Sequence, residues 1–278
     1  MGYKTILVNC DASKTVDRPL DVATELAQRF DANLVGLHAR RPFEAPTYYD
    51  VGVPMGPLFE AYEQGANADQ AAAKAAFDKA IKGKHLPAEW RVVDGYADDE
   101  LAVSARYADL LVVGQTDREN ISPTPGDLPE SVALATGRPV LVVPYIGAAK
   151  PPGKIVMLCW NASRESARAA TDALPFLKKA DEVIVMVVDP QPSANGHGAE
   201  PGADVATWLS RHGIKVTVQR DVAADTDVGN VILSRAADRG VDLIVMGVYG
   251  HSRLRELVLG GASRTLLSSM TVPVLMSH

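Results

Sequence analysis

Short apolar runs alternate with segments of mixed polarity along the whole chain. In the second half, the runs at 155–160, 183–188 and 242–246 consist mostly of Val, Ile, Leu and Met. Strands that are apolar on both sides are typical of a parallel sheet with helices on each face. The alternation therefore predicts an α/β protein.

Helical patterns lie between these runs. After the first run, apolar residues recur at spacings of three and four, which predicts one amphipathic helix. These residues are Ala167, Ala170, Leu174 and Leu177. Ser163 is placed to cap this helix, with Glu165 in its first turn. A strand at 214–218 and a helix from about 228 to 239, ended by Gly240, are predicted further along.

The two halves of the chain repeat one another. Three apolar blocks occur twice, in the same order and with nearly the same spacing, which predicts two copies of one domain. The pairs are KTILVNCDAS at 4–13 with KIVMLCWNAS at 154–163, DLLVVG at 109–114 with DLIVMG at 242–247, and RPVLV at 138–142 with VPVLM at 272–276.

Domain limits follow from this repeat. We expect one domain at 1–146 and a second at 152–278, joined by the short linker GAAKPPG at 147–153. The first copy carries an insertion at about 42–65 that is rich in Pro, Gly and Tyr, followed by an alanine-rich helix at about 68–81.

Composition narrows the class of protein. The chain has 278 residues, is 47% hydrophobic and carries a net charge of −6, which gives no broad basic surface for nucleic acid. No apolar run approaches the 18 or so residues of a membrane span, and the N-terminus lacks a signal-peptide pattern. Cys10 and Cys159 lie in separate predicted strands and are expected to be buried thiols. We therefore expect a cytoplasmic protein.

The most informative feature follows the strand at 242–246. Gly247 and Gly250 come directly after it, and the cluster Gly260, Gly261, Ala262 and Ser263 lies further on. Glycines at a strand end that leads into a helix let backbone N–H groups approach a phosphate. The segment between the clusters contains His251, Arg253 and Arg255, which could screen phosphate charge or be only a solvated face. The sequence therefore predicts a nucleotide phosphate site.

The spacing Gly-x2-Gly-x9-Gly resembles the nucleotide-binding signature of the universal stress protein family. One departure is Gly261, because the family usually has Ser or Thr directly after the third glycine; a hydroxyl follows at Ser263. The resemblance implies two tandem Rossmann-like, doubly wound domains, each with a five-stranded parallel sheet in the order 3-2-1-4-5. It also implies that ATP is the ligand.

Ligands of such sheets bind at the carboxyl ends of the strands where the strand order reverses. In the second copy, these ends add Trp160, Asn161, Val188 and Met246 to the candidate site. Asn161 stands where nucleotide-binding relatives usually have an Asp that contacts adenosine, and Val188 stands where the backbone meets adenine. The alternatives are that Trp160 is core or interface packing and that Asn161 is a cap or turn residue.

The first copy departs from the same pattern. Gly126 aligns with Gly260, but Asp127 stands where a phosphate would need a neutral donor, and Pro129 replaces Ser263. The carboxylate would repel an anion. Asp11 retains the family's aspartate. We expect the first copy to bind triphosphate poorly, with a structural or partner-facing role or another ligand. His38 is expected to be a satisfied core histidine.

Three functions remain open. The first is a stress-response protein that binds ATP or another adenine nucleotide in the second copy and acts as a nucleotide-responsive regulator. The second is a nucleotide-independent scaffold or small-ligand carrier, and the third is a slow ATPase. No cluster has metal-ligand spacing, so Mg²⁺ would arrive only with the nucleotide. No catalytic motif is visible, and no Lys lies in the glycine cradle.

Partner surfaces are expected at the final strands. The runs at 139–143 and 273–276 are apolar enough for edge pairing. Relatives with one domain form dimers in this way, so the resemblance implies an intrachain pseudo-dimer or a homodimer through these strands. No nucleic-acid or membrane partner is expected.

Overall fold

The computed structural model describes residues 2–45, 55–116, 127–190, 199–224, 226–248 and 261–278. The strands are β1 (Thr5–Asn9), β2 (Asn33–Arg40), β3 (Ala88–Asp94), β4 (Leu110–Gly114), β5 (Val140–Val143), β6 (Ile155–Cys159), β7 (Glu182–Val188), β8 (Val216–Asp221), β9 (Leu243–Gly247) and β10 (Val274–Ser277). The helices of the described residues are α1 (Asp17–Phe30), α2 (Met55–Ile81), α3 (Ala97–Ala105), α4 (Leu128–Ala135), α5 (Arg164–Asp172), α6 (Leu174–Leu177), α7 (Ala203–Arg211), α8 (Val228–Asp238) and α9 (Gly261–Ser269).

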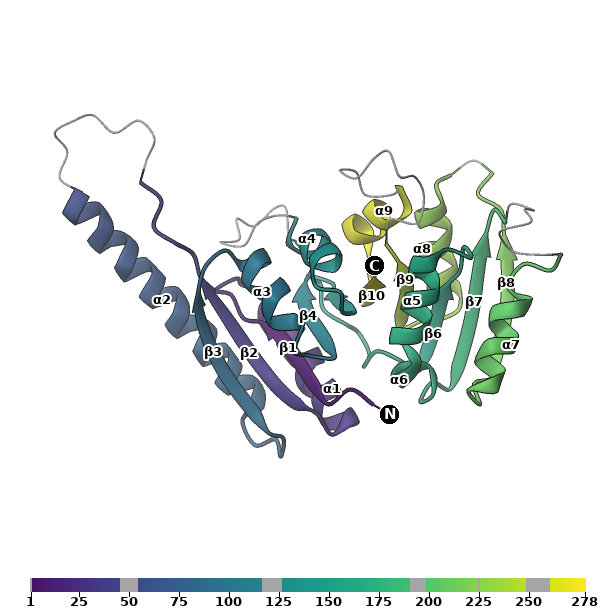
Figure 1. Cartoon of the computed structure of the whole chain (residues 1–278), viewed down its shortest axis with the longest axis horizontal. Helices are drawn as coiled ribbons and strands as arrows, with labels where there is room; N and C mark the ends of the chain where they lie inside the picture. The colour runs from purple at the N-terminus through teal and green to yellow at the C-terminus, as the bar shows by residue number, and fades with distance from the viewer. Residues whose placement is uncertain (1, 46–54, 117–126, 191–198, 225, 249–260) are drawn as a thin grey trace.

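All these strands belong to one sheet. Its order is β3-β2-β1-β4-β5-β10-β9-β6-β7-β8. Read from its other end, the second half, β8-β7-β6-β9-β10, has the same 3-2-1-4-5 order as the first half. Pairing within each half is parallel, whereas β5 and β10 pair antiparallel with Leu141 opposite Leu275. The chain is therefore a tandem of two Rossmann-like domains, side by side in Figure 1. The final strands β5 and β10 pair with one another inside the sheet, which is the expected intrachain pseudo-dimer.

Helices cover both faces of the sheet. Successive strand residues point to opposite faces: Ile6 and Val8 join a core with α1, α2, α5, α6 and α7, whereas Leu7 joins a core with α3, α4, α8 and α9. Both cores contain residues from the two domains. The prediction of continuous apolar strands covered on each side is therefore confirmed.

An aromatic cluster holds the two domains together at the linker. The rings of Tyr3, Phe30 and Phe176 meet edge to face, with centroids 5.0–5.6 Å apart. Arg29 lies over two of these rings and donates to the carbonyl oxygens of Pro152 and Gly153 at 2.7 and 3.0 Å. Such ring pairs contribute about 0.5–1.5 kcal/mol each beyond area burial. The linker is therefore a fixed part of the interface.

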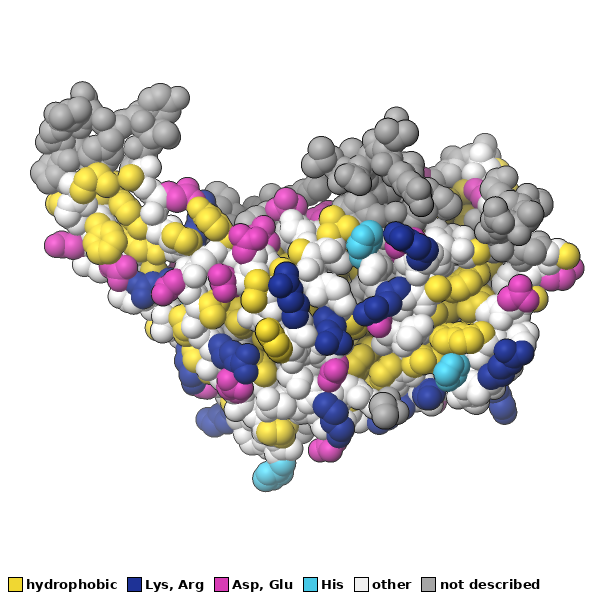
Figure 2. Space-filling view, viewed as in Figure 1, with side chains coloured by type: hydrophobic (Ala, Val, Ile, Leu, Met, Phe, Trp, Pro, Cys, Tyr) yellow, Lys and Arg dark blue, Asp and Glu magenta, His cyan; other side chains and the backbone are white. Residues whose placement is uncertain are grey.

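Helix α2 begins earlier than the sequence suggested. It starts at Met55, inside the segment interpreted as an insertion, and not near residue 68. Pro57 is tolerated because it lies in the first turn, where its missing N–H has no intrahelical partner. The outer part of α2 is exposed, and hydrophobic side chains gather on it in Figure 2. Phe43 packs against Phe59 and Tyr62 there, which gives this part of the helix its contact with the chain after β2.

The prediction of a single helix after Ser163 is wrong. It is divided into α5 and α6 at Ala173, because Pro175 lacks the N–H that would continue the helical ladder. Ala167, expected on the buried face, is exposed. The strand expected at 214–218 begins two residues later, at Val216. Helix α8 and its end at Gly240, which has a φ of 62°, are confirmed.

No helix among the described residues is long and apolar enough to cross a bilayer.

Candidate functional site

The candidate site lies where the carboxyl ends of β6 and β9 meet. These two strands are neighbours in the sheet, yet α5 follows β6 on one face and α9 follows β9 on the other. In doubly wound folds, ligands usually bind at the carboxyl ends of two neighbouring strands whose helices diverge in this way. Both helices begin at this end of the sheet.

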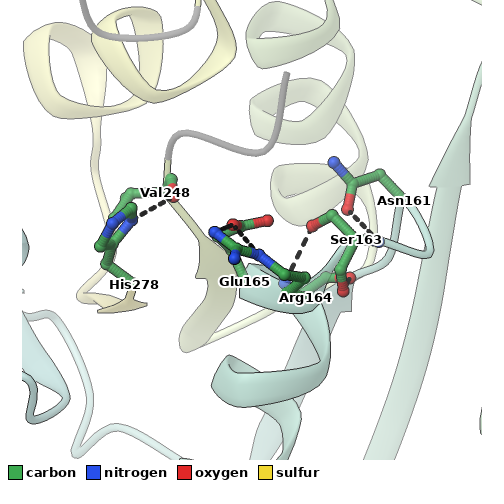
Figure 3. A network of polar contacts seen from close by, with 7 residues as sticks. Asn161, Ser163, Arg164, Glu165, Val248 and His278 are labelled. Carbon is green, nitrogen blue, oxygen red and sulfur yellow. Dashed lines mark hydrogen bonds and ion pairs between the residues drawn. The ribbon is translucent and has the colours of Figure 1, made fainter. Parts of the chain in front are cut away.

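Asn161 forms the turn between β6 and α5. Its Oδ1 accepts a hydrogen bond from the Ser163 N–H at 3.2 Å, while the residue itself is exposed. Ser163 then caps the helix, because its Oγ accepts from the Ser166 N–H at 3.1 Å. Figure 3 shows these side chains side by side. The prediction of Ser163 as N-cap is confirmed, and the turn interpretation of Asn161 is correct as far as its oxygen is concerned.

Gly247 is required by helix packing. A Cβ at this position would lie 2.5 Å from the Ser166 nitrogen and 2.7 Å from the Glu165 carbonyl oxygen. These atoms belong to the backbone of α5, so they cannot move aside without shifting the helix. The glycine therefore serves the close approach of α5 to β9 whether or not a phosphate is bound.

Glu165 is a buried carboxylate at this edge that the sequence analysis considered only as a first-turn acid. Its side chain is 7% exposed and pairs with the Arg164 guanidinium at 3.0 Å. Burial acts to raise its pKa, but the bonds from its own N–H, Arg164 and Ser163 prevail and hold the pKa below its ordinary value. The carboxylate therefore stays charged at neutral pH and is paired with the exposed Arg164 guanidinium (Figure 3).

The remaining strand ends supply apolar walls. Trp160 is half-buried and packs against the core on the α5 side, whereas Val188 is half-buried against the other core. Met246 is 5% exposed and belongs to that second core. The sheet brings these residues to one edge: Trp160 N–H donates to the Met186 carbonyl oxygen at 2.8 Å, two residues before Val188.

Helix α9 carries the described part of the glycine cradle. Gly261 is its first residue and is exposed, Ala262 is half-buried, and Ser263 is 4% exposed. Among the described residues, a Cβ at Gly261 would meet nothing within 4 Å. The predicted site residues Gly250, His251, Arg253 and Gly260 lie outside the described residues.

Val248 and His278 complete this edge. The Val248 N–H donates to the Ser277 carbonyl oxygen at 2.9 Å, and the Val248 carbonyl oxygen lies 3.2 Å from His278 Nδ1. Figure 3 places the His278 ring beside the strand that leads into the cradle. No motif in the sequence marks His278 as a site residue.

The first domain repeats this turn. Asp11 Oδ1 accepts from the Ser13 N–H at 3.0 Å, in the same arrangement as Asn161 and Ser163. Its strand-end glycine, Gly114, is not crowded: a Cβ there would lie 3.8 Å from the Pro19 ring. Asp127 occupies the N-cap position of α4, but its side chain makes no capping bond. Gly126 lies outside the described residues.

His38, Cys10 and Cys159 have structural roles. Cys10 is buried, but Cys159 is only half-buried, so the expectation of two buried thiols is met by Cys10 alone. His38 is 6% exposed and its Nδ1 lies 2.8 Å from the Cys10 carbonyl oxygen, which confirms it as a satisfied core histidine. Burial raises the pKa of the Cys10 thiol, and it raises that of Cys159 to about 12. Neither thiol is a nucleophile at neutral pH. Within the described ranges, His, Cys, Asp and Glu side chains form no group of three that could hold a metal ion.

Comparison with known proteins decides the family. The universal stress protein family model matches residues 2–144 and again residues 153–278. The chain belongs to the universal stress protein family. The two matches coincide with the two Rossmann-like domains, so this is a tandem universal stress protein.

Individual relatives agree with this assignment. A universal stress protein of Synechocystis sp. is 34% identical over 87 residues, which are 31% of this chain and 27% of that protein. A universal stress protein from Archaeoglobus fulgidus has a TM-score of 0.71 at 16% identity, with 98% of this chain and 95% of that chain covered. The latter similarity establishes the two-domain fold. A universal stress protein determined in complex with cAMP is 29% identical, covers 51% of this chain and 98% of its own, and has a TM-score of 0.33.

Proposed function

We propose that this universal stress protein binds an adenine nucleotide, ATP in the first instance, in its C-terminal domain and acts as a nucleotide-responsive regulator in a stress response. The nucleotide would lie at the carboxyl ends of β6, β7 and β9. One observation carries the proposal: α5 and α9 diverge from adjacent strands and direct their N-termini to the same sheet edge. Helix N-termini favour anions through their free N–H groups and the helix dipole. In α5 the first-turn N–H groups of Glu165 and Ser166 are already bonded to the Glu165 carboxylate and to Ser163, so the phosphates are assigned to α9.

The small residues of α9 are central to the phosphate side. Gly261 is exposed, and no described residue lies within 4 Å of a Cβ placed there. The described surroundings therefore leave room for a phosphate at the first turn of α9. Ser263, although largely buried, follows in the same turn. We assign the phosphates to Gly261, Ala262 and Ser263, together with Gly250, His251, Arg253 and Gly260.

The adenosine side is assigned to the ends of β6 and β7. The Asn161 Oδ1 is engaged by the Ser163 N–H, whereas the Asn161 amide nitrogen makes no bond to a described residue and can donate to a ribose or base acceptor. The backbone of Val188 is the proposed contact of the adenine ring, and Trp160 is its proposed apolar neighbour. Met246 and Gly247 form the floor between the two sides.

Two substitutions at one residue test this proposal. Gly261→Ser restores the hydroxyl that most family members have, in a position with room for it. We expect ATP·Mg to bind about tenfold more tightly, because a hydrogen bond to a charged group contributes about 1.5–3 kcal/mol. Gly261→Ala adds the same Cβ without the hydroxyl and serves as the matched control. Calorimetric titration that shows equal affinity for Gly261→Ser and Gly261→Ala would place the phosphates elsewhere.

A scaffold or small-ligand carrier without nucleotide is the second candidate. The observation that favours it is that Gly247 and the Asn161 oxygen both have structural roles in the protein alone. This candidate predicts no heat on titration with ATP·Mg and no response to Gly261→Ser. The nucleotide proposal predicts the opposite for both.

A further inference from the structure

The end of β4 in the first domain contacts the helix that carries the proposed phosphate cradle of the second. Gln115 follows β4 directly and is 6% exposed. Its Nε2 donates to the Leu267 carbonyl oxygen in α9 at 2.7 Å, across 152 residues of sequence. Its Oε1 accepts from the Tyr145 N–H at 3.1 Å. The amide is therefore fixed at both ends.

Its counterpart in the second domain is apolar. The Gln115 N–H donates to the Val143 carbonyl oxygen at 2.7 Å, and the Val248 N–H donates to that of Ser277 at 2.9 Å, so the two residues occupy equivalent positions. A valine cannot donate to a helix carbonyl. The cross-domain bond is therefore a property of one copy and not a requirement of the fold.

The bond acts on the carboxyl end of a short helix. Leu267 is among the last four residues of α9, whose carbonyl groups have no intrahelical donor, and the last turn of α9 contains no basic residue. Gln115 supplies a donor there. The other end of α9 begins with Gly261, six residues from Leu267 and therefore roughly 9 Å away at 1.5 Å per residue. A nine-residue helix moves as one body, so a constraint on its last turn also fixes its first.

We infer that Gln115 is a positioning residue through which the N-terminal domain sets the phosphate affinity of the C-terminal site. This inference rests on the proposed nucleotide function. The carboxyl end of β4 is also where the first domain's own sheet would meet a ligand. Any change there that displaces Gln115 shifts α9, and by linkage phosphate binding at α9 acts back on the first domain.

The test uses the full chain and two probes, ATP·Mg and adenosine. Gln115→Val introduces the residue of the equivalent position, and Gln115→Glu keeps the acceptor for the Tyr145 N–H but has no N–H for Leu267. Both variants are expected to raise the Kd for ATP·Mg about tenfold, a typical coupling between sites, and to leave the Kd for adenosine unchanged. A merely structural role would weaken both ligands alike.

Lys179→Met is the matched control. It removes another bond between the domains, from Lys179 Nζ to the Arg29 carbonyl oxygen at 2.9 Å, that does not involve α9. Its affinity for ATP·Mg should equal that of the wild type. If the wild-type chain binds ATP·Mg and both Gln115 variants bind it equally well, the inference is overturned but the proposed function is not. The same holds if the variants lose affinity for ATP and adenosine alike. A wild-type chain that binds neither probe would overturn the proposed function and this inference with it.

Discussion

The two domains build the same turn at the same strand end with different side chains. Asp11 in the first domain and Asn161 in the second each accept one N–H bond through a side-chain oxygen. Since either residue supplies that oxygen, this turn bond does not need the negative charge. The difference between the two domains is therefore a difference in what each presents to a ligand.

The two strand-end glycines, in contrast, are the same residue type with different structural roles. Gly247 is required because α5 passes directly against it, whereas its counterpart Gly114 has room for a side chain. A strand-end glycine is therefore poor evidence of phosphate binding by itself. The more telling contrast lies at the next helix, where an unconstrained Gly261 begins α9 and Asp127 precedes α4. No packing contact or capping bond among the described residues explains Gly261 or Asp127, so we interpret the difference between them as functional.

The largest expected effect breaks the comparison at the strand-end glycines. Gly247→Ala should lower the free energy of unfolding by about 2–3 kcal/mol, because the added Cβ overlaps the backbone of α5. Gly114→Ala is the matched control and should change it by less than about 0.5 kcal/mol. Urea denaturation measures both. Equal effects of the two substitutions would mean that α5 does not pack on β9 in this way.

The next prediction separates the roles of the two turns. Asn161→Ala and Asp11→Ala should each lower the free energy of unfolding by about 1 kcal/mol, since each removes one bond to a backbone N–H. Only Asn161→Ala should also weaken ATP binding, by about tenfold. Urea denaturation and calorimetry on the same samples provide the two readouts. An equal loss of ATP affinity in Asp11→Ala would contradict the assignment of the site to the second domain.

The smallest expected effect concerns Glu165. Its folded-state pKa lies below the ordinary value of 4.5, so it stabilises the protein above that pH and the contribution is lost as pH falls through the lowered pKa. Glu165→Gln should reduce the loss of stability between about pH 5 and pH 3 by less than about 1 kcal/mol, since Arg164 is exposed.

Glu25 provides a control of opposite sign. Burial raises its pKa above the ordinary value, so its contribution favours the folded state at low pH and is lost as pH rises through the raised pKa. Glu25→Gln should therefore make the acid-induced loss of stability larger. If both substitutions moved the pH profile in the same direction, the assignment of the two carboxyl environments would be wrong.

Much of the fold was predictable from the sequence, because continuous apolar strands and the internal repeat both report directly on a parallel α/β core. The break at Ala173 was missed because the apolar spacing continues across Pro175, where the backbone cannot continue. The early start of α2 was missed because Pro57 suggests a loop until it is placed in a first turn.

The candidate site was predictable only in part. Strand ends can be located from the sequence, so Trp160, Asn161, Val188 and Met246 were found at one sheet edge. The contact of Gly247 with α5 and the bond from Gln115 to Leu267 depend on how distant helices pack. A single sequence contains no local signal for such contacts, since Gln115 and Leu267 lie 152 residues apart.

The central claim is that one of the two domains binds nucleotide. The most direct measurement is to denature freshly purified protein, identify and quantify any released nucleotide, and titrate the stripped chain with ATP·Mg in a calorimeter. The account predicts one adenine nucleotide per chain. Two per chain would contradict the functional asymmetry between Asp127 and Gly261, and neither release nor heat of binding would contradict nucleotide binding altogether.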